Sequence, residues 1–353
     1  MKKIFLLAVV CLLLVGCSSA PKKENKYGCD TLKVFNTGVY IGDNVVSDFE
    51  KEYGVKVIYD LFASNEEMYT KLLGGETYDI LYPSDYMIER LISENKLQKL
   101  DKSLLVGLDT LQPDVLGLPF DKENEYAVPY MYGNVGIVYN KNNVSEDDLK
   151  NQGYNIFLNQ KYKGKNYMYD SQRDAFMVAF KALGYSMNTE KEEEINAAYE
   201  WLMKFKTTMD TVLVDDQVID GMINEEKDIA LMYSGDATYV ISENSNLGFF
   251  MPESGTNLWT DAMVIPSDSK CPLLAHEWMN YNLREDIATR NSTTIGYTSS
   301  VKKVADQLYG AGGAYEGIDA YVVRKNENDE VFVYSELLKK KLDDLWTRVK
   351  AHN

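Results

Sequence analysis

Carboxylate and aromatic side chains gather in a few short segments of this 353-residue chain. Trp259 and Asp261 stand at alternating positions, which places both side chains on one face of an extended strand. Asp174 and Asp236 lie in two other segments, each rich in polar residues. Carboxylates, together with the electron-rich faces of Trp and Tyr, are groups that bind alkylammonium ions. These residue types therefore favour a binding site for an organic cation.

The same residues are open to other interpretations. Neutral sugars also stack on aromatic rings and bond to Asp side chains, so a sugar site is an alternative. Asp236 and Asp261 are also the residue types that a glycosidase uses as an acid pair. Ser171 and Asp174 would equally form a capping box at the start of a helix, and Ser84 would cap another. A cap of this kind needs no role in ligand binding.

Several other chemistries are disfavoured by what the chain contains. It has only two histidines and no Cys-x-x-Cys pair, which argues against a transition-metal site and a histidine-dependent triad. The glycine-rich stretch at 310–315 lacks the last glycine of a dinucleotide fingerprint. A formal net charge of −17 opposes binding to nucleic acid. We expect no metal and no cofactor.

The segments that carry these residues alternate with strand and helix patterns. Strands are expected at 32–35, 55–59, 78–82, 135–139, 166–169, 228–233 and 261–266. Helices are expected at 45–53, 68–73, 86–92, 175–183, 272–283 and 334–350, and another after Thr189 through Lys206. Gly54 is expected to end the first helix in a left-handed conformation. Capping boxes are expected for Ser64 with Glu67 and for Thr189 with Glu192.

This alternation predicts parallel, doubly wound sheets, and the pattern restarts after about residue 135. Two α/β units are therefore expected. In such sheets ligands bind at the loops that follow the strands. The segments 36–40, 83–86, 170–174 and 233–236 each follow an expected strand, whereas 258–261 precedes one.

The first residues indicate export. Lys2 and Lys3 precede an apolar run that ends at Gly16 and Cys17, the pattern of a signal peptide with a cysteine after the cleavage point. We expect a signal peptide at 1–16, a lipid on Cys17 and a flexible tether at 17–30. The protein would then be anchored by lipid to the outer face of the cell membrane. An ordinary signal peptide with a chance cysteine is the alternative.

Cys29 and Cys271 remain in the exported part, where a disulfide could form between them. The sequence does not show whether their Cα atoms come within bonding range. This pairing is left open.

Seven segments carry a family resemblance by their order and spacing. They are VKVIY at 55–59, SNEEMY at 64–69, PSDY at 83–86, VPY at 128–130, LGY at 183–185, WTD at 259–261 and IGY at 295–297. With them the chain, from Leu32 to its last helix, resembles the spermidine/putrescine-binding lipoproteins of polyamine ABC transporters. The resemblance implies capture of spermidine or putrescine without catalysis, and delivery to the permease subunits. A sensor that binds the same ligand is an alternative.

The resemblance also implies an α/β fold of the two-lobed periplasmic-binding-protein type (type II). Each lobe would hold a mixed, mainly parallel sheet flanked by helices, with the ligand in the cleft between lobes. The N-terminal lobe would comprise 31–138 and 257–304, and the C-terminal lobe 139–256 and 305–353. The protein would act as a monomer, with hinges near 132–139 and 255–261.

The resemblance further assigns roles to single residues. The implied ligand-binding residues are Thr37, Tyr40, Ser84, Tyr86, Ser171, Asp174, Tyr233, Asp236, Trp259, Asp261 and Tyr297. Asp174, Asp236 and Asp261 would neutralise ammonium groups. Tyr40, Tyr86, Tyr233, Trp259 and Tyr297 would enclose the methylene chain.

Some positions depart from the family pattern. Thr37 stands where the family usually has Trp, and Tyr233 also replaces a usual Trp. Ser171 stands where spermidine binders often have an aspartate, and the C-terminal polar contact, near Phe332 or Tyr334, cannot be placed. Three carboxylates suit the three nitrogens of spermidine, whereas Asp236 and Ser171 favour putrescine. The sequence favours spermidine only slightly.

Overall fold

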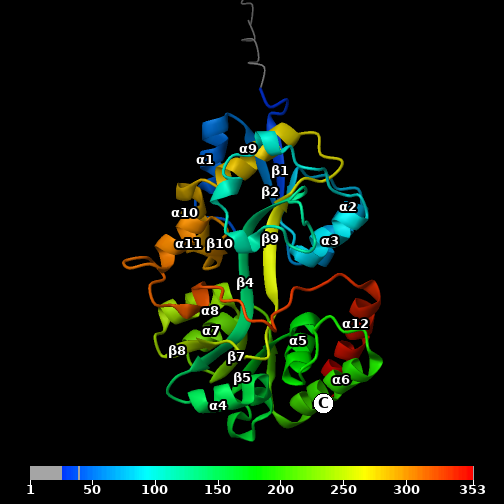
Figure 1. Cartoon of the computed structure of the whole chain (residues 1–353), viewed down its shortest axis with the longest axis vertical. Helices are drawn as coiled ribbons and strands as arrows, with labels where there is room; N and C mark the ends of the chain where they lie inside the picture. The colour runs from blue at the N-terminus through cyan, green and yellow to red at the C-terminus, as the bar shows by residue number, and fades with distance from the viewer. Residues whose placement is uncertain (1–25, 39, 353) are drawn as a thin grey trace, which may run out of the picture.

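The chain folds into two lobes joined by long strands (Figure 1). The computed structural model describes residues 26–38 and 40–352. The signal peptide at 1–16, Cys17 and most of the tether lie outside the described residues. Within the described ranges, no helix is both long and apolar enough to cross a membrane.

The first lobe is built on three parallel strands, β1 (Thr31–Thr37), β2 (Lys56–Phe62) and β3 (Ile80–Leu81). Strand β9 (Leu258–Val264) runs antiparallel to β3 and extends this sheet. The helices around it are α1 (Val45–Tyr53), α2 (Asn65–Leu73), α3 (Asp85–Ser93), α9 (Pro272–Asn282), α10 (Glu285–Ile295) and α11 (Lys302–Tyr309). Figure 1 shows α2 and α3 on one side of the sheet and α1, α10 and α11 on the other.

The second lobe repeats this design. Strands β5 (Asn166–Tyr169), β6 (Val212–Val214) and β7 (Ile229–Tyr233) are parallel, and β8 (Leu247–Phe250) pairs with the long strand β4 (Ala127–Asn140). The helices of this lobe are α4 (Glu146–Gln152), α5 (Gln172–Ala182), α6 (Glu192–Thr208), α7 (Gln217–Ile223), α8 (Ser234–Glu243) and α12 (Glu336–Ala351). Helix α12 packs against α5 and α6, so the chain ends on the second lobe.

Strand β4 (Ala127–Asn140) belongs to both lobes. Its first part pairs antiparallel with β9, and from Val135 onward it pairs with β7 and β8. The segment before β9 and the segment 322–335 are the other connections between the lobes (Figure 1). The crossings at β4 and β9 coincide with the expected hinges. The exact lobe boundaries remain a proposal.

Some of the expected helix ends and capping boxes are confirmed, and others are not. Helix α1 has the expected bounds, and Gly54 ends it at φ 69°. Ser64 accepts a hydrogen bond from the backbone of Glu67 (3.1 Å). In a complete capping box the Glu67 carboxylate would accept a hydrogen bond from the backbone N–H of Ser64. Here it accepts from the backbone N–H of Ala63 instead (2.7 Å). The box of Thr189 with Glu192 is wrong, since α6 begins at Glu192 itself and Lys191 is its N-cap.

Two further expectations about the site segments are corrected. Ser84 occupies the N-cap position of α3 but makes no capping hydrogen bond. Its hydroxyl instead accepts from the side chain of Asn65 (3.1 Å) in α2. Strand β9 begins at Leu258 rather than at Asp261, because its pairing with β4 extends to that residue. Trp259 and Asp261 therefore lie inside a strand, not before one.

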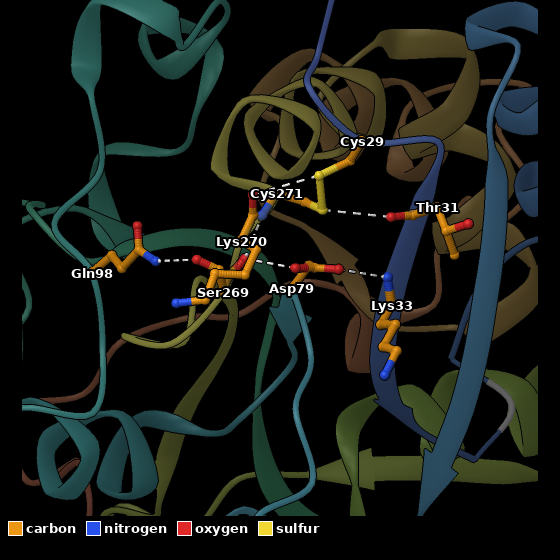
Figure 2. The surroundings of a disulfide bond; sticks show 8 residues. All are labelled: Cys29, Thr31, Lys33, Asp79, Gln98, Ser269, Lys270 and Cys271. Atoms are coloured by element: carbon orange, nitrogen blue, oxygen red, sulfur yellow. Dashed lines mark hydrogen bonds between the residues drawn. A yellow bond between two sulfur atoms is a disulfide. The ribbon is translucent and has the colours of Figure 1, made fainter. Parts of the chain in front are cut away.

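Cys29 and Cys271, whose pairing the sequence left open, form a disulfide, and their Cα atoms are 5.8 Å apart. The bond ties the segment before β1 to the N-terminus of α9 (Figure 2). Beside it, Asp79 accepts from the backbone of Lys33 (2.9 Å) and from the hydroxyl of Ser269 (2.7 Å). The start of the first sheet is thus fixed to α9 both covalently and by hydrogen bonds.

Candidate ligand-binding cleft

A cleft of about 1270 Å³ lies between the lobes. All the residues that the sequence analysis singled out for ligand binding line it. They are Thr37, Tyr40, Ser84, Tyr86, Ser171, Asp174, Tyr233, Asp236, Trp259, Asp261 and Tyr297. The fold thus brings together loops and strands from both lobes. Whether each side chain contacts a ligand stays a prediction.

Asp261 lies on β9, which pairs with β3 of the first lobe and with the first part of β4. The Tyr40 hydroxyl donates to its Oδ2 (2.6 Å). Its Oδ1 is buried and has no hydrogen-bond partner in the described part of the chain. Burial raises the pKa of this carboxyl above its ordinary value. A buried carboxylate oxygen without a partner is costly, so this atom is poised to accept a donor from a ligand.

Asp174 presents a similar oxygen from the second lobe. Its side chain is 2% exposed, and the Tyr233 hydroxyl donates to its Oδ2 (2.8 Å). Its Oδ1 is buried without a partner among the described residues, and burial raises the pKa of the carboxyl. Ser171 does cap α5, because its hydroxyl accepts from the backbone of Asp174 (3.4 Å). Ser171 therefore caps the helix while Oδ1 of Asp174 stays without a hydrogen-bond partner among the described residues.

Asp236 stands in the first turn of α8. The Tyr169 hydroxyl donates to it at 3.1 Å and the Tyr297 hydroxyl at 3.5 Å. Burial raises the pKa of this carboxyl to about 6. Because Tyr297 belongs to the first lobe, the bond from Tyr297 crosses the cleft.

Aromatic rings form a continuous wall beside these acids. The ring centres of Tyr40 and Tyr297 are 5.9 Å apart, and those of Tyr297 and Trp259 are 4.9 Å apart. Tyr233 follows at 6.3 Å from Trp259, and Tyr169 stacks on Tyr233 at 5.0 Å. Such a wall offers flat apolar faces next to carboxylates, an arrangement suited to the stem and charged ends of an alkylammonium ion.

Sequence reasoning missed the buried acid Asp85, which follows Ser84 at the start of α3. Asp85 is 2% exposed, and its carboxylate accepts from the backbones of Tyr86 (2.6 Å) and Thr260 (3.3 Å). Burial raises its pKa to about 7. The bond to Thr260 fixes β9 between Trp259 and Asp261. The signal was an acid in the PSDY segment, in which only Ser84 and Tyr86 were expected to bind a ligand.

Tyr86 is the candidate whose surroundings differ most from the expectation. The guanidinium carbon of Arg173 lies 3.6 Å from the centre of its ring. The Tyr86 hydroxyl lies 3.4 Å from both carboxylate oxygens of Glu66. Arg173, Glu66 and Tyr169 also line the cleft and were not predicted. The contact of Arg173 with Tyr86 depends on how the lobes meet, which the local sequence does not show.

No cluster of three or more metal-ligating side chains is found in the described part of the chain.

The chain was compared with models of known protein families. A family model for bacterial extracellular solute-binding proteins matches residues 44–315. The chain belongs to this family of extracellular solute-binding proteins. Its two lobes and interlobe cleft are those of a periplasmic-binding-protein fold.

Individual relatives of this solute-binding protein carry more specific names. A spermidine/putrescine-binding periplasmic protein of Salmonella typhimurium is 32% identical over 81% of this chain and 80% of its own length. The putrescine-binding periplasmic protein PotF of Escherichia coli is 29% identical over 77% of this chain and 78% of its own. A solved structure from Listeria monocytogenes, described as a putative spermidine/putrescine ABC transporter, has a TM-score of 0.82 at 32% identity. The matched region covers 92% of this chain and 100% of the Listeria monocytogenes chain.

Proposed function

We propose that this protein captures a polyamine, spermidine or putrescine, and delivers it to the permease subunits of an ABC transporter. The observation that carries the proposal is a pair of buried carboxylate oxygens beside an aromatic wall, on Asp174 and Asp261, which have no hydrogen-bond partner among the described residues. Protonated amines would supply the missing donors. The names of the relatives from Salmonella typhimurium and Escherichia coli point to the same ligands.

In this proposal the acids and rings have separate roles. Asp174, Asp236 and Asp261 neutralise the ammonium groups, while the aromatic side chains pack against the methylene chain. These side chains are Tyr40, Tyr86, Tyr233, Trp259 and Tyr297. Thr37, Ser84 and Ser171 complete the polar lining. The role is capture without catalysis, so Asp236 and Asp261 act as a charge pair for a ligand rather than as a glycosidase pair.

Transport would use closure of the lobes around the ligand. A ligand held by Asp261 of one lobe and Asp174 of the other binds the closed form better than the open form. Rotation would occur at β4 and β9, which connect the lobes. We place the monomeric protein outside the cytoplasm, anchored to the cell membrane by a lipid on Cys17.

Titration calorimetry tests the proposal against a sugar or another ligand. The purified protein is titrated with putrescine, with spermidine and with a panel of neutral sugars, at low and high salt. The proposal predicts one-to-one binding of a polyamine that weakens as salt screens the carboxylates. Binding of a sugar with little response to salt, and no heat with either amine, would refute it.

A further inference from the structure

Four side-chain oxygens of cleft residues are buried and have no hydrogen-bond partner among the described residues. They belong to Gln172, Asp174, Asn257 and Asp261. The proposed function already uses the two carboxylates, and Gln172 is only partly buried. Asn257 is 3% exposed, so its Oδ1 is an amide acceptor inside the cleft that has no role yet. Burying an amide oxygen without a donor costs free energy, and a ligand that donates to it would recover that free energy.

Asn257 lies in line with the residues of β9 that face the cleft. The backbone around it is extended, because Asn257 forms a parallel bridge with Glu330, and the Leu258 N–H donates to the carbonyl oxygen of Glu330 (2.7 Å). Asn257, Trp259 and Asp261 are alternate residues and therefore share one face. At 3.2–3.4 Å per residue, this row is about 13 Å long. An amide, an aromatic ring and a carboxylate thus follow one another along the cleft.

The amide end of the row adjoins α5, the helix that carries Asp174. The hydroxyl of Thr256, the residue before Asn257, is 4.0 Å from the sulfur of Met177. Met177 lies three residues after Asp174, on the next turn of α5. The oxygens of Asp174 and Asn257 therefore stand on the same side of the cleft, while Asp261 ends the row on the other side. A primary ammonium group has three N–H donors, so it can use both oxygens at once.

We propose that Asn257 is a ligand-binding residue whose Oδ1 accepts a hydrogen bond from the ammonium group that Asp174 neutralises. The inference rests on the proposed function and adds a neutral acceptor to its carboxylates. The ligand would extend along the row, with its methylene stem against Trp259 and another ammonium group at Asp261. In the free protein the amide oxygen receives no donor from the described residues, and the ammonium group supplies that donor.

The test uses two substitutions that keep the approximate shape of the side chain. Asn257→Leu should weaken polyamine binding by at least about tenfold, because a hydrogen bond to a charged group is lost. The ligand-free variant should be no less stable than the wild type, because an apolar group replaces a buried polar one. Asn257→Asp restores an oxygen acceptor and should bind the polyamine at least about tenfold more tightly than Asn257→Leu. Calorimetry with putrescine and with spermidine at pH 8 gives the affinities, and denaturant unfolding gives the stabilities.

The matched control is a second buried amide in the second lobe. Asn166, at the start of β5, is fully buried, and its Oδ1 also has no partner among the described residues. It is Tyr169, at the other end of this strand, that lines the cleft. Asn166→Leu should therefore leave polyamine affinity unchanged.

Three results would overturn the inference while leaving polyamine capture intact. The first is wild-type affinity in Asn257→Leu. The second is an Asn257→Asp variant that binds polyamine no more tightly than Asn257→Leu, which would show that the amide only supports the strand. The third is an equal loss of affinity in Asn166→Leu. Binding of neither amine by the wild type would instead overturn the proposed function, and this inference with it.

Discussion

At the scale of single residues, the cleft is defined by carboxyls that burial makes reluctant to ionise. Burial raises the pKa of Asp236 to about 6 and that of Asp85 to about 7, and it raises the pKa values of Asp174 and Asp261 as well. A bound ammonium group reverses this effect because it stabilises the charged form. Polyamine binding is therefore coupled to loss of protons from the cleft.

This coupling predicts how affinity depends on pH. Above the raised pKa values the acids are already ionised, and binding costs no deprotonation. As the pH falls from about 7 to 5, the carboxyls of the free protein take up protons that the amine must displace, so affinity falls. We expect up to about tenfold weaker binding per pH unit for each coupled carboxyl. Calorimetry in buffers of different ionisation enthalpy measures the released protons directly.

One variant serves as the control for that measurement. Asp236→Asn should flatten the pH profile near 6, because the variant has no proton to lose at that position. An affinity that is constant between pH 7 and 5 would contradict the coupling, since the amines of the ligand stay protonated throughout this range.

The sequence indicated these residues to different degrees. Trp259 and Asp261 could be paired from their spacing alone, because alternate positions of a strand share a face. Asp174 and Asp236 were found because they follow strands. Arg173 also follows a strand, but its contact with Tyr86 joins segments that are remote in sequence. Glu66 lies 3.4 Å from the Tyr86 hydroxyl, a contact between α2 and α3 that local spacing does not show. Asp85 lies in a segment that was expected to bind ligand, but its own burial against β9 was not predicted.

At the scale of secondary-structure elements, the lobes meet at a contact between α8 and the end of α10. A Cβ atom built on Gly235 would lie 1.9 Å from the ring of Tyr297. A Cβ atom built on Gly296, at φ 85°, would lie 2.7 Å from the carbonyl oxygen of Gly235. Only a glycine at position 235 lets the rings and acids of the two lobes come this close.

The variant Gly235→Ala is expected to keep the lobes from closing fully. Polyamine affinity should fall by at least about tenfold. The free protein should not lose stability within the second lobe, because Ala favours a helix over Gly by about 1 kcal/mol. Calorimetry gives the affinity, and small-angle X-ray scattering gives the compaction on adding ligand.

The matched control lies on the same helix. Ser242→Ala also raises helix propensity, but Ser242 is exposed and its hydroxyl donates within the helix, to the carbonyl oxygen of Tyr239 (2.7 Å). It should leave both affinity and compaction unchanged. Wild-type affinity in Gly235→Ala would show that the close approach at this point is not needed for binding.

At this scale the sequence predicted the elements better than their edges. Helix α1 and strand β5 have the bounds that the pattern indicated, because the Gly54 cap and the tyrosines of β5 are local signals. The start of β9 was misplaced by three residues because pairing with β4, not propensity, decides where that strand begins. The capping hydrogen bond expected of Ser84 is absent because Asn65 bonds to its hydroxyl.

At the scale of the whole molecule, the disulfide joins residues 242 positions apart in the chain. It joins the segment before β1 to the N-terminus of α9, and Figure 1 shows both elements in the first lobe. The bond closes a loop that contains most of both lobes. In the unfolded chain it removes many conformations, and this favours the folded state.

Replacing both cysteines, Cys29→Ser with Cys271→Ser, should lower the free energy of unfolding by about 2–4 kcal/mol. Polyamine affinity should not change, because the bond is remote from the cleft. Denaturant unfolding measures the first effect and calorimetry the second. Reducing agent should destabilise the wild type and leave the variant unaffected. Equal stability of the two proteins would contradict this role.

The two-lobed architecture could be predicted from the sequence because the strand–helix alternation occurs twice. The disulfide could not, since nothing local indicates whether Cys29 and Cys271 approach each other. The path of the segment 322–335 could not be predicted from the sequence either. That segment has no helix or strand pattern of its own, yet it brings Phe332 to the cleft.

The most direct test of polyamine capture in this cleft is the dissociation constant of putrescine and spermidine for the wild type and Asp261→Ala. Asp344→Ala, an exposed acid on α12, controls for the loss of one negative charge. We expect a polyamine to bind the wild type and the control equally well, and the Asp261 variant more weakly by roughly 2–5 kcal/mol, because the substitution leaves a desolvated ammonium group unpaired. Equal affinity of Asp261→Ala and the wild type would contradict the account.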